Sequence, residues 1–200
     1  MATQKERMLA GEPYLADDPE IAADVLRAER LSAEVNSSPA GDPDRRRAAL
    51  AALLGGLGEG SEVRPPLRVD LGYRTTIGPR SFVDFNAVFL DVAPITIGAD
   101  VLIGPNVQLL TPTHPLNPER RRATWEAAEP ITIGDNVWLG GGVVVCPGVT
   151  IGADTVVGAG AVVTRDLPAG VVAVGNPARV VRSVADPAPG AAPAGGEPAS

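Results

Sequence analysis

Residues 131–163, ITIGDNVWLGGGVVVCPGVTIGADTVVGAGAVV, repeat one pattern every six residues. An aliphatic side chain recurs at each sixth position, and glycine follows it in four of the six repeats. An amphipathic helix buries every third or fourth residue and a half-buried strand every second, so neither explains this period. Hexapeptide repeats are typical of a β-helix, in which each repeat forms one short strand and one turn and the coils stack in parallel. The aliphatic series comprises Ile133, Leu139, Val145, Ile151, Val157 and Val163.

The same period extends toward the amino end of the chain. Three aliphatic residues lie in phase with the first series: Ile97, Ile103 and Leu109. A further series has the same period but is shifted by two residues: Leu71, Ile77, Val83 and Phe89. We therefore expect an all-β core, a parallel β-helix over residues 63–182, in which each coil buries the apolar face of its neighbours.

The segments on either side of the repeats differ from them in composition. In residues 1–62, the apolar residues between Pro19 and Val35 follow the spacing of an amphipathic helix. Asp42 followed by Pro43 has the form of an N-cap and a first helical residue. Residues 183–200 consist mainly of Ala, Pro and Gly, which bury too little apolar surface to offset the entropy of ordering. We expect a small α-helical segment over 1–62 and a disordered tail over 183–200.

The overall composition excludes several classes of protein. The 200 residues carry a net charge of −7, whereas a general nucleic-acid binder needs a basic face that displaces counterions. The single cysteine, Cys146, excludes an intrachain disulfide and a multi-cysteine zinc site. No apolar run reaches the roughly 20 residues of a membrane span, and residues 1–14 lack the apolar core of a secretory signal. We expect a cytoplasmic protein with neither nucleic acid nor membrane as a partner.

Several motifs together resemble the hexapeptide-repeat acyltransferases, in particular the maltose and galactoside O-acetyltransferases and their nodulation-factor relatives. The motifs are KERMLAGEPY (5–14), LDVAPITIGADVLIGPNV (90–107), THPLNPE (113–119), PITIGDNVWLGGGVVVCPGVTIG (130–152) and VGNPARVVR (174–182). The match covers nearly the whole chain except the tail. The resemblance implies a left-handed parallel β-helix with three hexapeptides in each coil. It also implies transfer of an acetyl group from acetyl-CoA to a sugar hydroxyl, without a metal.

A loop interrupts the repeat between Leu110 and Pro130. Loops of this length are uncommon in compact domains and are often functional. This one contains the only histidine of the chain, His114, whose imidazole can accept a proton near neutral pH. The resemblance implies that His114 is the general base and that the backbone N–H of Gly141 stabilises the oxyanion. Because the family transfers the acyl group directly, Cys146 is not expected to be a nucleophile.

The resemblance also assigns binding residues. Asp84 and Asn86 would contact the acceptor together with Asp17 and Asp70. Where the family usually has asparagine, this chain has Asp84, and a carboxylate accepts hydrogen bonds but lacks the amide donor. Arginine suits the CoA phosphates because its planar fork donates two hydrogen bonds to one anion. The expected CoA contacts are Trp138 as a tunnel wall, Gly141, Ala159, Thr164, Arg165, Arg179 and Arg182.

The flat faces of such a prism suit packing against identical neighbours. We predict a homotrimer with one site between each pair of adjacent subunits. Two other functions of the same architecture stay open: acetyl transfer to a non-sugar alcohol, and a catalytically silent β-helix that serves as an assembly module. A β-helical carbonic anhydrase is excluded, because it needs three histidine ligands for each zinc ion and the chain has one histidine.

Overall fold

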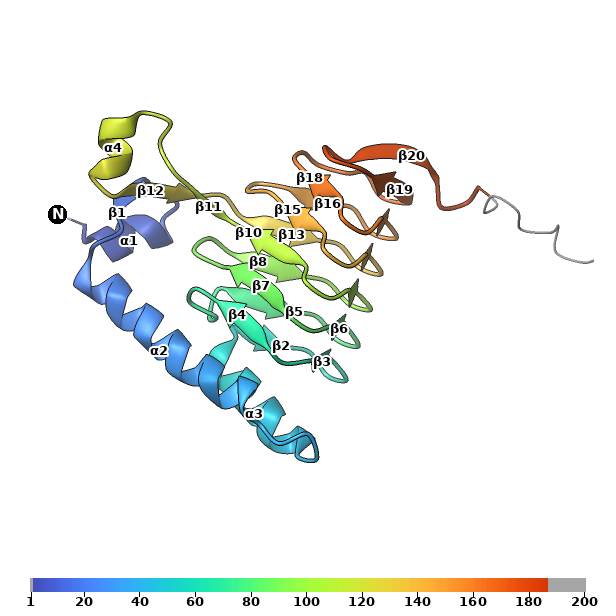
Figure 1. Ribbon diagram of the computed structural model, residues 1–200, viewed down its shortest axis with the longest axis horizontal. Coiled ribbons are helices and arrows are strands. Elements are labelled where there is room, and N and C mark those ends of the chain that lie inside the picture. Colours follow the sequence, from blue (N-terminus) through green and yellow to red (C-terminus); the bar gives the residue numbers. More distant parts are fainter. Residues whose placement is uncertain (1, 187–200) are drawn as a thin grey trace, which may run out of the picture.

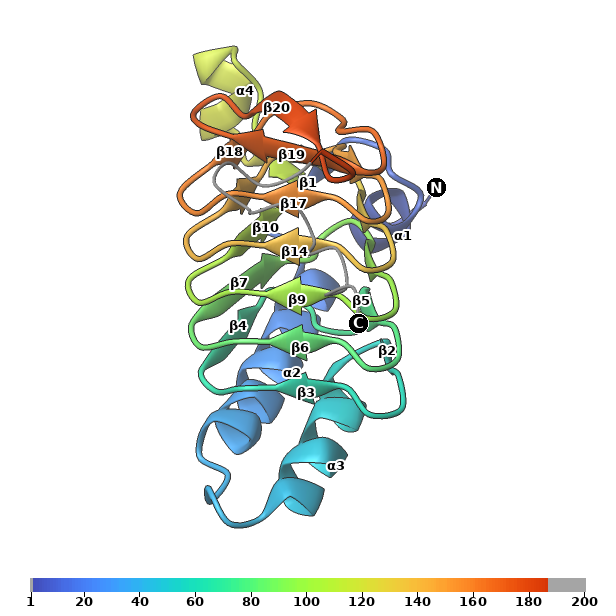
Figure 2. The same ribbon diagram turned by 90° about the vertical axis from the view of Figure 1, so that its right-hand side faces the viewer.

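The chain folds as a left-handed parallel β-helix, as the six-residue repeat and the family resemblance together predict (Figures 1 and 2). The computed structural model describes residues 2–186. Within them, three parallel sheets form the faces of a prism, helices cover the end where the coils begin, and a hairpin lies at the other end. The predicted tail, residues 183–200, lies outside the described residues from 187 onward. No helix of the described part is long and apolar enough to cross a membrane.

Each face of the prism is one sheet, and consecutive strands of the chain lie on successive faces. The first face contains β2 (Gly56–Leu57), β5 (Thr75–Ile77), β8 (Ile95–Ile97), β13 (Ile131–Ile133) and β16 (Thr150–Ile151). The second contains β4 (Leu67–Val69), β7 (Ala87–Leu90), β10 (Gln108–Leu110), β15 (Val144–Val145) and β18 (Val162–Val163). The third contains β3 (Glu62–Val63), β6 (Phe82–Val83), β9 (Leu102–Ile103), β14 (Trp138–Leu139), β17 (Val156–Val157), β19 (Val171–Val174) and the antiparallel β20 (Arg179–Ser183).

The strand register explains the two phases of the sequence repeat. In the later coils Trp138 pairs with Val156, and the two are separated by the length of three hexapeptides. In the earlier coils the separation between Phe82 and its partner Leu102 is longer by two residues, so the aliphatic series shifts by two. Leu102 then pairs with Trp138 across the protruding loop. The separation between Leu102 and Trp138 equals the length of two regular coils, so the aliphatic series keeps the same phase before and after the loop.

The aliphatic series forms the core, and the glycines permit the coils to stack. All six aliphatic residues of the later coils are buried, and each contributes about 1.5–3 kcal/mol of hydrophobic stabilisation. A Cβ built on Gly134 would lie 2.6 Å from the backbone nitrogen of Ala153 in the next coil. The close approach of the two backbones therefore requires glycine here. The backbone conformation does not, because the φ of Gly134 is not in the left-handed region.

The amino-terminal segment contains α1 (Gln4–Leu9), β1 (Tyr14–Leu15), α2 (Pro19–Asn36) and α3 (Pro43–Leu53). The helices predicted after Pro19 and after Asp42 are both present, and Asp42 caps α3 by accepting a hydrogen bond from the backbone of Arg45. The capping box of Thr3 and Glu6 starts α1, which the sequence analysis did not predict. Hydrogen bonds between the side chain of Asn36 and the backbone of Leu67 hold α2 against the first coil.

The loop over residues 110–130 is more ordered than its sequence indicates. It contains β11 (Pro112–Thr113), α4 (Pro118–Arg122) and β12 (Trp125–Ala128). β12 pairs antiparallel with β11 and also with β1, so the loop and the amino-terminal segment form a small sheet outside the prism. The guanidinium groups of Arg7 and Arg120 both lie over the ring of Trp125, at 5.9 and 5.2 Å from its centroid. The loop is therefore fixed to the amino end of the chain.

Candidate functional site

His114 directly follows β11 and faces a carboxylate on β12. Its Nδ1 lies 3.7 Å from Oε1 of Glu126, slightly beyond hydrogen-bond length. Tyr14 on β1 donates a hydrogen bond of 2.7 Å from its hydroxyl to the other oxygen, Oε2 of Glu126. Burial and this hydrogen bond raise the pKa of Tyr14, so its hydroxyl stays a donor. With Nδ1 facing Glu126, Nε2 is the nitrogen of His114 on the side of the ring away from this carboxylate.

The imidazole borders a hollow of about 300 Å³, here called the loop pocket. Its polar lining consists of Tyr14, Asp70, His114 and Glu126. Its apolar lining comes from the amino-terminal segment and the ends of the coils: Met8, Ala16, Ile21, Val25, Leu71, Leu90, Val92 and Pro112. Burial, and then repulsion from the carboxylates of Asp91 and Glu126, raise the pKa of Asp70 to about 6. A small polar molecule with apolar faces fits such a lining.

The raised pKa of Asp70 predicts a measurable effect on stability. The native state binds a proton at Asp70 more tightly than the unfolded state, whose aspartates have a pKa near 3.8. The stabilisation from this proton is complete below pH ~4 and is lost as the pH rises toward ~6. The Tm of wild type should therefore fall relative to that of Asp70→Asn as the pH rises from 4 to 6. Calorimetric Tm values at four pH values measure this, and parallel curves would contradict it.

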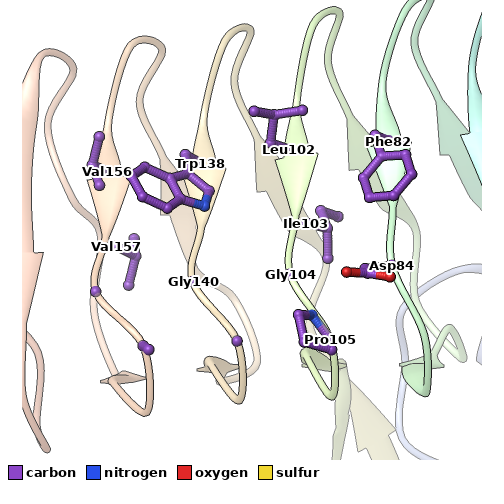
Figure 3. A pocket seen from close by; sticks show the side chains of 13 residues that line it. Phe82, Asp84, Leu102, Ile103, Gly104, Pro105, Trp138, Gly140, Val156 and Val157 are labelled. Atoms are coloured by element: carbon purple, nitrogen blue, oxygen red, sulfur yellow. The ribbon is translucent and has the colours of Figure 1, made fainter.

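A second hollow, here called the groove, runs over the outside of the third face (Figure 3). It has a volume of about 510 Å³ and is lined mainly by apolar residues and glycines. Trp138, Gly141, Ala159 and Asp84, all predicted site residues, line it together. Figure 3 shows Phe82, Leu102, Trp138 and Val156 in a row across neighbouring coils, with Asp84 beside Gly104 and Pro105 below that row. The side chain of Trp138 is half-exposed.

Three consecutive glycines occupy positions 140–142, of which Gly140 and Gly141 line the groove, and the middle one is the least constrained by the fold. A Cβ at Gly140 would lie 2.6 Å from the backbone nitrogen of Ala159, and Gly142 has a φ of +70°. A Cβ at Gly141 would meet Pro105 no closer than 3.3 Å, and its φ is ordinary. Among the described residues, none accepts a hydrogen bond from the N–H of Gly141. This N–H is therefore available to a ligand.

The other predicted site residues line neither hollow. Asn86 occupies an exposed turn with a φ of +61°, and Asp17 is exposed before α2. Thr164 and Arg165 are exposed in the turn after β18. In the terminal hairpin, Arg179 and Arg182 donate hydrogen bonds to nearby backbone carbonyls. In a single chain, the three arginines predicted to bind the CoA phosphates therefore lie outside the lining of the groove.

The loop pocket and the groove lie at opposite edges of the second face. Asp84, Gly104 and Gly141 precede β7, β10 and β15, whereas Asp70 and His114 follow β4 and β10. In one chain, the strands of this face therefore lie between the imidazole and the groove.

Comparison with known proteins places the chain in a family. The family models "maltose acetyltransferase hexapeptide capping motif" and "bacterial transferase hexapeptide" match residues 7–58 and 130–165. Nodulation protein L of Rhizobium meliloti (strain 1021) is 48% identical over 178 residues, which are 89% of this chain and 97% of that protein. A maltose O-acetyltransferase from Clostridium difficile 630 has 39% identity and a TM-score of 0.90, covering 92% of this chain and 99% of that one. A galactoside acetyltransferase in complex with coenzyme A has 38% identity and a TM-score of 0.88, covering 92% of each chain.

The chain belongs to the maltose and galactoside O-acetyltransferase family. It is a hexapeptide-repeat acetyltransferase, as the motifs of the sequence indicate. The sequence did not indicate two residues near His114 of this acetyltransferase, Tyr14 and Glu126. Tyr14 lies in a quoted motif, but nothing in its spacing shows that its hydroxyl reaches Glu126, 112 residues away. Glu126 lies in a loop without periodicity, so no pattern indicates it.

Proposed function

We propose that this acetyltransferase moves the acetyl group of acetyl-CoA to a hydroxyl group of a sugar, with His114 as the general base. The contact series from Tyr14 through Glu126 to His114 is the observation that carries the proposal. It orients the single imidazole of the chain at the edge of a pocket of about 300 Å³ that has both polar and apolar walls. The family names, maltose and galactoside acetyltransferase, support a sugar as the acceptor.

The proposed reaction uses His114 twice. Its Nε2 removes the proton of the acceptor hydroxyl while the oxygen attacks the thioester carbonyl of acetyl-CoA. The tetrahedral intermediate carries an oxyanion, and the N–H of Gly141 donates a hydrogen bond to it. When the intermediate collapses, the C–S bond breaks and the imidazolium returns the proton to the leaving thiolate. The products are an acetyl ester and free CoA. The carboxylate of Glu126 stabilises the imidazolium between the two proton transfers.

The groove has the chemistry that the pantetheine arm of CoA requires. Its lining is largely apolar and glycine-rich, so a thin flexible chain can lie close to the backbone. Trp138 forms one wall and Ala159 lies farther along. We propose that Thr164 also contacts the pantetheine arm, beyond this lining. We propose that Arg165, Arg179 and Arg182, which are on the later coils and the terminal hairpin, reach the phosphates.

We propose that three chains assemble so that the groove of one subunit meets the loop pocket of its neighbour. Two observations support this arrangement. The groove and His114 lie at opposite edges of the second face, so one chain does not bring them together. The groove lining also leaves large apolar side chains exposed, among them Leu102 and Trp138, and such patches mark interaction surfaces. A closed ring of three places each groove against the next subunit.

An acceptor panel tests the proposed function. The protein is mixed with acetyl-CoA and with glucose, maltose, a galactoside or a non-sugar alcohol, and free thiol is followed over time. We expect thiol release that depends on a sugar and yields an acetylated sugar in mass spectra. Release with only the non-sugar alcohol would favour the other acceptor class, and failure to turn over acetyl-CoA with any of them would favour the silent assembly module.

A further inference from the structure

Leu116, in the loop between β11 and α4, exposes its apolar side chain almost completely. Its relative exposure is 95%, whereas the other exposed large apolar side chains of the described residues reach at most 57%. A single exposed leucine has no functional meaning by itself. Leu116, however, lies two residues from His114, and specific hydrogen bonds hold its backbone. The loop therefore presents an apolar side chain beside the proposed general base.

The backbone on both sides of the Leu116 side chain is fixed. Nη1 of Arg121 donates hydrogen bonds of 2.9 Å to the carbonyl of Pro115 and 3.2 Å to the carbonyl of Leu116. The next residue, Asn117, caps α4 by accepting hydrogen bonds from the backbone of its first turn. A side chain held in this way loses little conformational freedom when it meets another surface. Leu116 is thus preorganised for contact.

The groove lacks an outer wall in the single chain. All of its lining residues belong to the third face or to the corner that joins this face to the second. Leu102 on β9 and Trp138 on β14 pair with each other in this lining, and they are 50% and 53% exposed. A pantetheine arm that lies here is covered from one side only, whereas binding sites usually enclose most of their ligand. The second wall therefore has to come from another molecule.

The loop has the position and the charge to supply this wall from a second copy of the chain. In Figures 1 and 2, α4 stands away from the prism, and no loop residue lines the groove of its own chain. The five residues of α4 include three arginines and one glutamate, whereas the whole chain has a net charge of −7. A locally basic projection on an acidic protein favours contact with another copy.

We infer that Leu116 of one subunit packs against Leu102 and Trp138 of its neighbour and forms the outer wall of that neighbour's groove. The inference rests on the proposed assembly of three chains, and it names the side chain that joins the two halves of the site. Arg121 is a positioning residue, because it acts only by holding the backbone at Leu116. Since Leu116 is two residues from His114, the same contact positions the imidazole at the neighbour's groove.

Chemical cross-linking tests the contact without an activity measurement. Leu116→Cys and Leu102→Cys are combined in a Cys146→Ser background and treated with a short bismaleimide. Because a closed ring links each chain to the next, we expect covalent trimers on a denaturing gel. The control pairs Leu102→Cys with Leu26→Cys, since Leu26 is a half-exposed leucine on α2 that lines neither hollow. The control should migrate as single chains. Migration of the test variant as single chains would overturn the inference.

Calorimetric titration with CoA tests the role of the side chain. Leu116→Ser should bind CoA about tenfold more weakly, the lower end of what the burial of a leucine contributes. Leu116→Met should restore the affinity, because it keeps an apolar side chain of similar size. Arg121→Ala should cause a smaller loss, and Leu26→Ser should cause none.

Two results of the titration would overturn the inference: wild-type affinity in Leu116→Ser, or an equal loss in Leu116→Met. If either occurs while wild type forms trimers and acetylates a sugar, the proposed function and assembly stand without the inference. Light scattering that shows wild type to be a single chain would overturn both the assembly and the inference.

Discussion

Replacing His114 with alanine should lower the turnover of acetyl transfer by roughly 10²–10⁴-fold, the usual contribution of a general base. Water can still accept the proton of the hydroxyl, but it is neither positioned nor basic enough near neutral pH. In the proposed mechanism His114 meets CoA only at the reacting sulfur, while the rest of the pantetheine arm lies along the groove, so CoA should bind with unchanged affinity. Thiol release under saturating acetyl-CoA measures the first quantity, and calorimetric titration with CoA measures the second.

Arg122→Ala is a suitable control for the histidine variant. Arg122 is exposed at the end of α4 on the same loop, and it lines neither hollow. Its substitution should leave both turnover and CoA binding at the wild-type values. If His114→Ala kept the turnover of wild type, the proposed mechanism would be wrong. If it lost CoA binding as well, the imidazole would have a role in the cofactor site instead.

Mixing two inactive variants should restore activity if the groove of one subunit works with His114 of the next. The first variant is His114→Ala, and the second is Ala159→Trp, whose exposed new side chain would fill the groove. In trimers assembled from equal amounts, half of the grooves and half of the histidines are intact. In each isolated mixed trimer, one of the three sites then combines both intact parts. Recovery should approach about one third of the wild-type turnover.

This experiment needs co-expression with two affinity tags, so that mixed trimers form and can be isolated. Each variant alone gives the baseline, and size-exclusion chromatography with light scattering shows whether it assembles. Preformed homotrimers mixed after purification should stay inactive, because their subunits are not exchanged. Mixed trimers without recovered activity would place the whole site inside one chain.

Much of the framework was predictable from local patterns. The six-residue period indicated the stacked coils, and the shift by two residues corresponds to early coils that are slightly longer than three hexapeptides. The N-caps at Asp18 and Asp42 begin the two long helices. The short strands β1 and β12 were not predicted, because segments of this length have no periodicity. Their pairing gives the predicted loop an ordered sheet.

The candidate site was predictable only in part. Four residues assigned by resemblance line the groove, and two line the loop pocket. The contact of Arg64 with Asp84 could have been found from the coil length, since residues one coil apart are stacked. No such rule exists for Tyr14 and Glu126, which belong to segments outside the repeat.

The sequence by itself determined the β-helix, because every repeat contacts mainly its neighbours and its burial pattern can be read within a few residues. It also determined which residue can act as an imidazole base, since the chain contains a single histidine. Only the tertiary structure decided which carboxylate faces that histidine and at which edge of the second face each hollow lies. Such contacts depend on where segments far apart in the chain meet, and the free energy that brings them together is spread over the whole packed fold.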